Sequence, residues 1–309
     1  GVVLMTEGEM QEATAEVLAT PTEKPVEDTA NLVLMTETPQ AGTITKVKDA
    51  KFGFQKWTLS NGVNVYVKKT DYKNDEIILS ATSRGGNALY GAKDHANIEV
   101  YNSVWSMNGV DQLSYNDLNK FMSGKQASVR FSIGSHSETV SGRTIPADIE
   151  IMMQLLYAGI VKPRNDKESF EVTRQMLAGV LKNQVNTPNY VFQDSLSNFV
   201  YNNDPRVKMI NMELLESVNY DRIREIHNER FSNAAEFEYY IIGNFDETQL
   251  KQLVCQYIAS LPVKKAKKEK AIDNKLNMKK GLVYGEFERA TENNNAMLAS
   301  IWNVNNIPY

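Results

Sequence analysis

Residues 54–101 constrain the fold of this chain more than any other stretch of the sequence. They begin with two short apolar runs on either side of Ser60, Asn61 and Gly62. An Asn-Gly pair between apolar runs is the strongest short-range signal for a β-hairpin. Residues 75–83 predict a further strand, which ends at a Gly-Gly pair. A helix that opens near Asp94 is expected to follow, with apolar residues at helical spacing.

Composition sets wide limits on function. The chain has 309 residues, of which 42% are hydrophobic and 23% charged, with a formal net charge of −4. No basic excess points to nucleic acid or to an anionic membrane, so neither partner is expected. A single cysteine, Cys255, excludes an internal disulfide and a cysteine-cluster metal site. Cys255 falls on an apolar helical stripe, which indicates a core position, and no apolar run reaches the ~20 residues of a membrane span.

Changes in composition divide the chain into four parts. Residues 1–49 are rich in Thr, Glu, Pro and Ala and are expected to form an extended linker, with a helical segment at residues 11–18. Residues 50–262 are expected to fold as one domain. Residues 263–280 form a basic, solvated linker. Two strands, at residues 282–289 and 296–303, are expected to begin an incomplete following domain within residues 281–309.

The periodicity within residues 50–262 predicts an α+β fold. Residues 126–133 alternate apolar and polar side chains, which is typical of a strand with one buried face. Helical stripes follow, and a late strand runs into a turn at Gly243 and a helix capped by Asp246. An antiparallel-rich sheet with helices packed on one face is therefore expected. The expected later helices cover residues 146–160, 167–185, 191–201 and 219–231.

These elements resemble one domain of the pitrilysin/insulinase metallopeptidases, the group that also includes the mitochondrial processing peptidases. The likeness rests on the Leu-Ser-Asn-Gly-Val hairpin at residues 59–63, the Ile-Ile-Gly-Asn-Phe-Asp turn at 241–246 and the Leu-Pro pair at 261–262. It implies a LuxS/processing-peptidase-like metallohydrolase fold. It also implies two halves around a closed chamber, of which typically only the first half carries zinc.

The resemblance locates a zinc motif that this chain does not reproduce. The family carries His-x-x-Glu-His on the helix after the second or third strand, so that two histidines reach one metal and the glutamate activates water. Here His95 stands near the first position, but Ile98 replaces the glutamate and Glu99 replaces the second histidine. The third ligand would fall at residues 178–180, which hold no carboxylate. No catalytic or metal-binding residue is therefore assigned.

A zinc site assembled from other residues is the weaker alternative. His95 and Glu99 are neighbours on one helix face, and His136 or Glu138 would have to supply a third ligand. His136 reads as a loop residue, and His227 as a packing residue on a later helix. No phosphate-binding or serine-nucleophile motif is present.

The sequence thus predicts a non-catalytic segment from the second half of a zinc peptidase, which forms part of the peptide-binding chamber. Its expected partners are a zinc-bearing catalytic half, in the same chain or a partner subunit, and a peptide substrate. The alternative is a scaffold or binding subunit of a wholly inactive homologue. Activity is not expected from the segment alone. Family habit favours the periplasm over the cytoplasm.

Overall fold

The computed structural model describes residues 8, 31–265, 269–270, 272–288 and 296–302. The chain divides into two units, residues 1–32 and 33–309, and the architecture below belongs to the second unit. The helix expected at residues 11–18 lies outside the described residues. None of the described helices is both long and apolar enough to cross a membrane.

Seven strands form a single mixed sheet in the order β1-β2-β3-β7-β4-β6-β5. Only β3 and β7 pair in parallel, and every other neighbouring pair is antiparallel, so the antiparallel-rich sheet is confirmed. The strands are β1 (Ile44–Asp49), β2 (Gln55–Leu59), β3 (Asn64–Lys69), β4 (Ile77–Arg84), β5 (Ala127–Ile133), β6 (Ser137–Thr144) and β7 (Glu238–Gly243).

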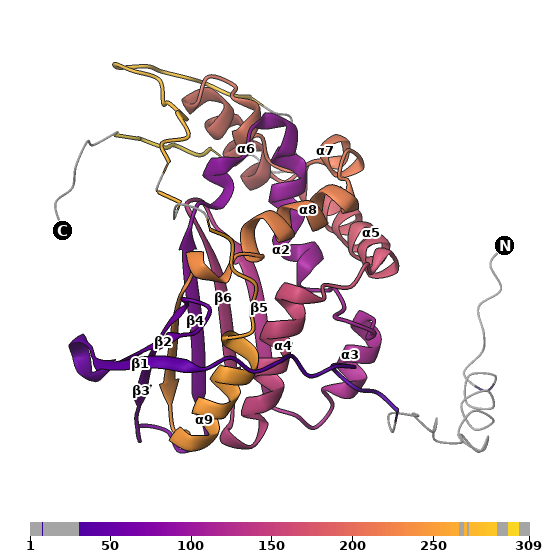
Figure 1. Ribbon diagram of the computed structural model, residues 1–309. Coiled ribbons are helices and arrows are strands. Elements are labelled where there is room, and N and C mark those ends of the chain that lie inside the picture. The colour runs from indigo at the N-terminus through magenta and orange to yellow at the C-terminus, as the bar shows by residue number, and fades with distance from the viewer. Residues whose placement is uncertain (1–7, 9–30, 266–268, 271, 289–295, 303–309) are drawn as a thin grey trace. The chain divides into compact units, whose positions relative to one another are not determined.

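The core helices pack on one face of this sheet, as expected (Figure 1). Along β4, Leu79 and Ala81 are fully buried on the helix side, whereas Ile78 on the other side is 43% exposed. The expected helices are present, and a short additional one, α7, was not predicted. The described helices are α2 (His95–Trp105), α3 (Tyr115–Phe121), α4 (Ile149–Val161), α5 (Lys167–Gln184), α6 (Pro188–Val200), α7 (Met212–Glu216), α8 (Tyr220–Phe231) and α9 (Glu247–Leu253), which continues as a π-helix at Val254–Ile258.

The predicted hairpin joins β2 and β3 and is tied to the far end of the domain. Gly62 has a φ of 85°, whereas Asn61 does not adopt a positive φ. The Asn61 side-chain amide instead donates to the carbonyl oxygens of Ile258 and Leu261, at 2.9 and 3.2 Å. Gly62 therefore provides the positive φ of the turn, and the Asn61 side chain bonds the hairpin to the end of the π-helix that follows α9.

Three sequence-based expectations differ from the structure. Strand β1 lies inside the segment expected to be a linker, and it was missed because all its residues after Ile44 are exposed, which leaves no buried alternation to detect. The strands expected at residues 282–289 and 296–303 are not found among the described residues there. A strand needs a neighbour to bond its backbone groups, and no described residue pairs with these segments. Cys255, expected in the core, is only partly buried.

Candidate functional site: the pocket at the start of helix α2

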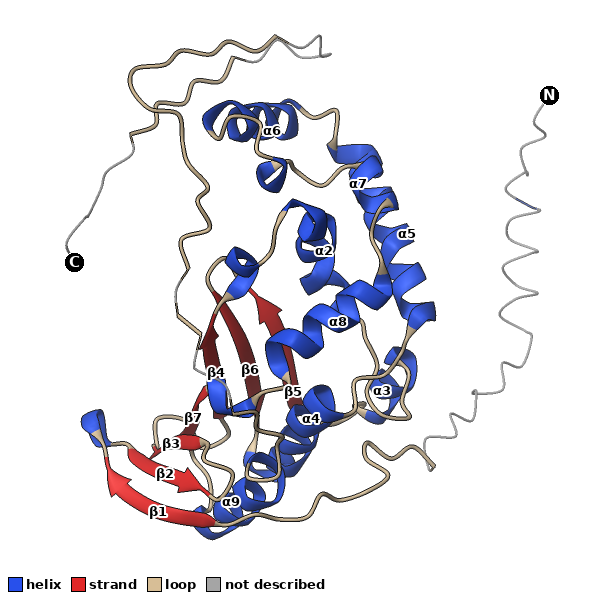
Figure 2. Cartoon of the chain, turned by 45° about the horizontal axis from the view of Figure 1, so that its top comes forward, coloured by secondary structure: helices blue, strands red, loops and turns tan. Residues whose placement is uncertain are grey.

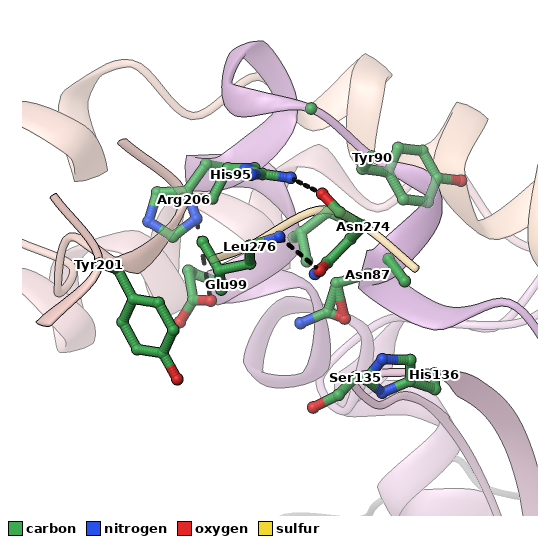
Figure 3. A pocket seen from close by; sticks show the side chains of 13 residues that line it. Asn87, Tyr90, His95, Glu99, Ser135, His136, Tyr201, Arg206, Asn274 and Leu276 are labelled. Atoms are coloured by element: carbon green, nitrogen blue, oxygen red, sulfur yellow. Dashed lines mark hydrogen bonds and ion pairs between the residues drawn. The ribbon is translucent and has the colours of Figure 1, made fainter. Parts of the chain in front are cut away.

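A pocket of about 340 Å³ lies where α2 begins, on the helix that would carry the zinc motif. The turn after β4 supplies Asn87 and Tyr90, and the first turns of α2 supply His95, Ile98 and Glu99. The remaining wall comes from the β5–β6 turn, from the segment between α6 and α7, and from the linker after residue 263 (Figure 3). The pocket thus combines four parts of the chain that are distant in the sequence, because the turn after β4 and the start of α2 are adjacent. The residues of that remaining wall include Ser135, His136, Tyr201, Arg206, Asn274 and Leu276.

His95 is buried and already bonded within the protein. Its Nε2 lies 2.7 Å from the carbonyl oxygen of Lys208, and since a carbonyl only accepts, this nitrogen donates its proton. The other ring nitrogen, Nδ1, lies 3.9 Å from a carboxylate oxygen of Glu99. The ring therefore anchors the segment after residue 207 to α2.

The residues around His95 do not fit a zinc site. Zinc in a peptidase takes three protein ligands and a water. One ring nitrogen of His95 is bonded to Lys208, and of the described side chains only that of Glu99 approaches the other as a possible ligand. Among the described residues, no group of three His, Cys, Asp or Glu side chains is arranged to hold a metal ion. Ile98, which occupies the position of the catalytic glutamate, is an apolar wall of the pocket.

His136 and Glu138, the two residues considered as a third zinc ligand, lie in different environments in the structure. His136 is an exposed loop residue that lines the same pocket as His95. Glu138 is fully buried instead, and its Oε1 accepts from the backbone N–H of Gly86 at 2.9 Å and from Arg230 at 3.3 Å. Burial raises the pKa of Glu138, and the hydrogen bonds from Gly86 and Arg230 oppose this rise. Its role is to hold Gly86, which directly precedes the pocket residues Asn87 and Ala88.

The pocket wall that the sequence did not predict is built around Arg206. This guanidinium binds both carboxylate oxygens of Asp204, and these hydrogen bonds lower the pKa of Asp204 to about 2. It also donates to the backbone carbonyl of Asn274 at 2.7 Å, which holds the linker against the pocket. Asn274 and Leu276 lie between the His95 side and the His136 side (Figure 3). Arg206 and Asn274 belong to no common sequence motif, so this contact could not be predicted from the sequence.

The chain is thus an α+β domain in which the described residues form no group of three potential metal ligands. Comparisons with known proteins then show what the chain resembles. The family model described as "Peptidase M16 inactive domain" matches residues 217–308. The resemblance to the pitrilysin-type M16 peptidases is therefore confirmed, and the fold is that of an M16 peptidase domain.

Individual relatives agree with this family. A "Zinc protease PQQL-like" protein of Arabidopsis thaliana is 24% identical over 233 residues, which cover 74% of this chain and 22% of that protein. The crystal structure of the periplasmic protease PqqL from Escherichia coli superposes with a TM-score of 0.70 at 18% identity, over 89% of this chain and 30% of that one. Pitrilysin superposes with a TM-score of 0.52 at 16% identity, over 77% and 26%. The chain thus spans about a fifth of the curated relative's length.

Proposed function

We propose that this chain is a non-catalytic segment of the second half of a zinc peptidase and that it completes a peptide-binding chamber opposite a zinc-bearing half. The main support is the engagement of His95. The ring that would bind zinc in a catalytic copy donates to the Lys208 carbonyl instead, and Ile98 stands where the general base would be. The match to a family model for an inactive M16 domain agrees with this proposal.

Among the described residues no further strand pairs with β5, and this edge of the sheet supports a peptide-binding role. The Asn102 side chain accepts from the N–H of Ile133 and donates to its carbonyl, both at 3.0 Å, as the backbone of a neighbouring strand would. In an antiparallel strand, every second residue points its backbone N–H and C=O groups away from the paired strand. Those of Phe131 and Val129 therefore point away from β6, as those of Ile133 do. An extended peptide can add to such an edge through main-chain hydrogen bonds.

A second pocket of about 340 Å³ lies beside this edge. Val129 and Phe131 of β5 form one wall, and the end of α2, helix α3 and helix α4 form the others. Much of its lining is apolar, from residues such as Trp105, Leu118 and Leu155. A strand added to β5 places alternate side chains on the helix side of the sheet, so this pocket would receive an apolar side chain of the bound peptide.

Reconstitution with the zinc-bearing half tests the proposal. That half is recognised by a His-x-x-Glu-His motif, either upstream in the same gene or in a partner subunit. We expect no cleavage of a quenched fluorescent peptide by this chain alone, and a rate at least about tenfold above that of the zinc-bearing half when both are mixed, because enclosure positions the substrate.

Two results would contradict this proposal. Cleavage by this chain alone, retained after chelation of contaminating protease metals and after further purification, would show a catalytic site of its own. Binding of the two halves without any gain in rate would favour the scaffold role instead. A Glu-to-Gln change in the zinc motif of the other half is the matched control, and it should abolish cleavage in the mixture.

A further inference from the structure

The sheet face that points away from the helices is open and carries a strong local charge. In Figure 2 the helices lie on one side of β4, β6 and β5, and none of the described helices lies on the opposite side of these strands. Arg84, Arg130 and Arg143 are exposed on this side, like Ile78. The side chains on it are those of alternate residues along each strand, so the pairing register identifies them.

Positive charge dominates these alternate positions. Seven basic residues from six of the strands share the open face with a single acidic strand residue, Glu238. The whole chain has a formal net charge of −4, so the charge of this face is opposite in sign to the net charge of the chain. The basic residues are Lys46, Lys48, Lys56, Lys68, Arg84, Arg130 and Arg143.

Most of these cations have no internal counter-charge. Among the described residues, only Arg143 of the seven forms an ion pair, with Glu76. Lys56 lies over the ring of Tyr66 at 5.6 Å, and Lys68 over the ring of Phe54 at 5.7 Å. The face therefore presents ammonium and guanidinium groups to whatever it meets, and unpaired charge of one sign attracts ligands of the other.

The aromatic residues on this face are arranged unlike a base-stacking platform. Tyr66 and Tyr240 stack on each other, with ring centroids 4.9 Å apart and planes 14° apart. Lys56 covers Tyr66, and Phe54 sits edge-on to Tyr240 at 5.8 Å. A single-stranded nucleic acid needs free ring faces on which its bases can stack. These contacts occupy the rings, so the face favours carboxylates over nucleobases.

We propose that the open sheet face recognises acidic polypeptide, and thus that the peptide this domain helps to enclose is selected for glutamate and aspartate. This inference rests on the proposed peptide-binding function and adds to it the class of substrate. The carboxylates would pair with Lys56 and Lys68 and with Lys46 and Lys48 on the neighbouring strand β1. Because these lysines are exposed or half-buried at the surface, the attraction is expected to weaken as salt is added.

Fluorescence anisotropy tests this proposal on the 309-residue chain. The probes are a fluorescein-labelled peptide rich in glutamate and a peptide in which each glutamate is glutamine. We expect the first to bind at least about tenfold more tightly at low salt. The double variant Lys56→Glu, Lys68→Glu should remove most of that difference. The control, Lys167→Glu with Lys182→Glu on α5, makes the same change in net charge away from the sheet and should leave binding within about twofold.

The other outcomes separate the two proposals. Equal binding of both peptides, unaffected by the sheet variant, would overturn the acidic selection and leave the peptide-binding function in place. Failure of both peptides to bind would count against the two together. Tighter binding of an oligothymidylate, lost in the sheet variant, would show that the face is a nucleic-acid surface instead. Circular dichroism of each variant confirms that the fold is retained.

Discussion

Replacing Gly243 with alanine is expected to lower the free energy of unfolding by more than about 3 kcal/mol. Gly243 ends β7 with a φ of 145°, a conformation that only glycine adopts readily. A Cβ there would lie 2.2 Å from the carbonyl oxygen of Glu76 and 2.8 Å from the Cα of Ile77. Both contacts are with backbone of β4 or the residue before it, which cannot move without disturbing the centre of the sheet.

Gly179 provides the matched control for this change. It lies inside α5 with no atom within 4 Å of an added Cβ and without a positive φ. Gly179→Ala should therefore raise the unfolding free energy by about 0.5–1 kcal/mol, because alanine favours the helix. Urea unfolding followed by circular dichroism measures both variants. A Gly243→Ala protein within about 1 kcal/mol of wild type would contradict the described turn.

Acid is expected to destabilise the domain through His227. The ring is fully enclosed: its Nε2 donates to the Gly159 carbonyl at 2.9 Å, its Nδ1 accepts from the Tyr101 hydroxyl at 2.8 Å, and Trp105 stacks on it with centroids 3.7 Å apart. Burial lowers the pKa of His227 from 6.5 to about 3. The unfolded chain thus takes up a proton below about pH 6.5 that the folded chain refuses, so stability falls as the pH falls.

The size of this effect follows from the two pKa values. Between pH 7.5 and pH 5, His227 should cost about 2 kcal/mol of stability, measured by urea unfolding at each pH. His227→Phe removes the titration, and the loss specific to His227 should vanish, although the variant starts about 2–3 kcal/mol lower because Tyr101 and Gly159 lose their partner. His136→Ala removes a histidine of the exposed β5–β6 turn without touching the His227 ring and is the matched control. Equal pH dependence in wild type and His227→Phe would contradict the prediction.

The sequence predicts the buried helices and strands of this fold well because an element with one buried face carries apolar residues at regular spacing. The alternation at residues 127–133 and the helical stripes are imprints of one buried face, and the structure confirms them. Strand β1 has no buried face and therefore shows no alternating apolar pattern in the sequence. Helix α7 spans only five residues, Met212–Glu216, too few for a helical period to show.

The candidate site divides along the same line. His95 and Glu99 are four residues apart on one helix, so their proximity follows from local geometry alone, and the structure places them together. Their contacts with the rest of the chain depend on tertiary structure. The bond from His95 to Lys208 spans 113 positions, and the bond from Arg206 to Asn274 spans 68. Neither joins residues of a recognisable motif, so neither could be predicted from one sequence.

We propose that His95 has a structural role in this chain and does not bind zinc. Zinc content measured by inductively coupled plasma mass spectrometry tests this most directly. The chain is purified in zinc-containing buffer and desalted, in parallel with His95→Ala. We expect zinc far below one equivalent per chain in both proteins, because two candidate ligands are too few. About one equivalent in the wild type, lost in His95→Ala, would contradict the account.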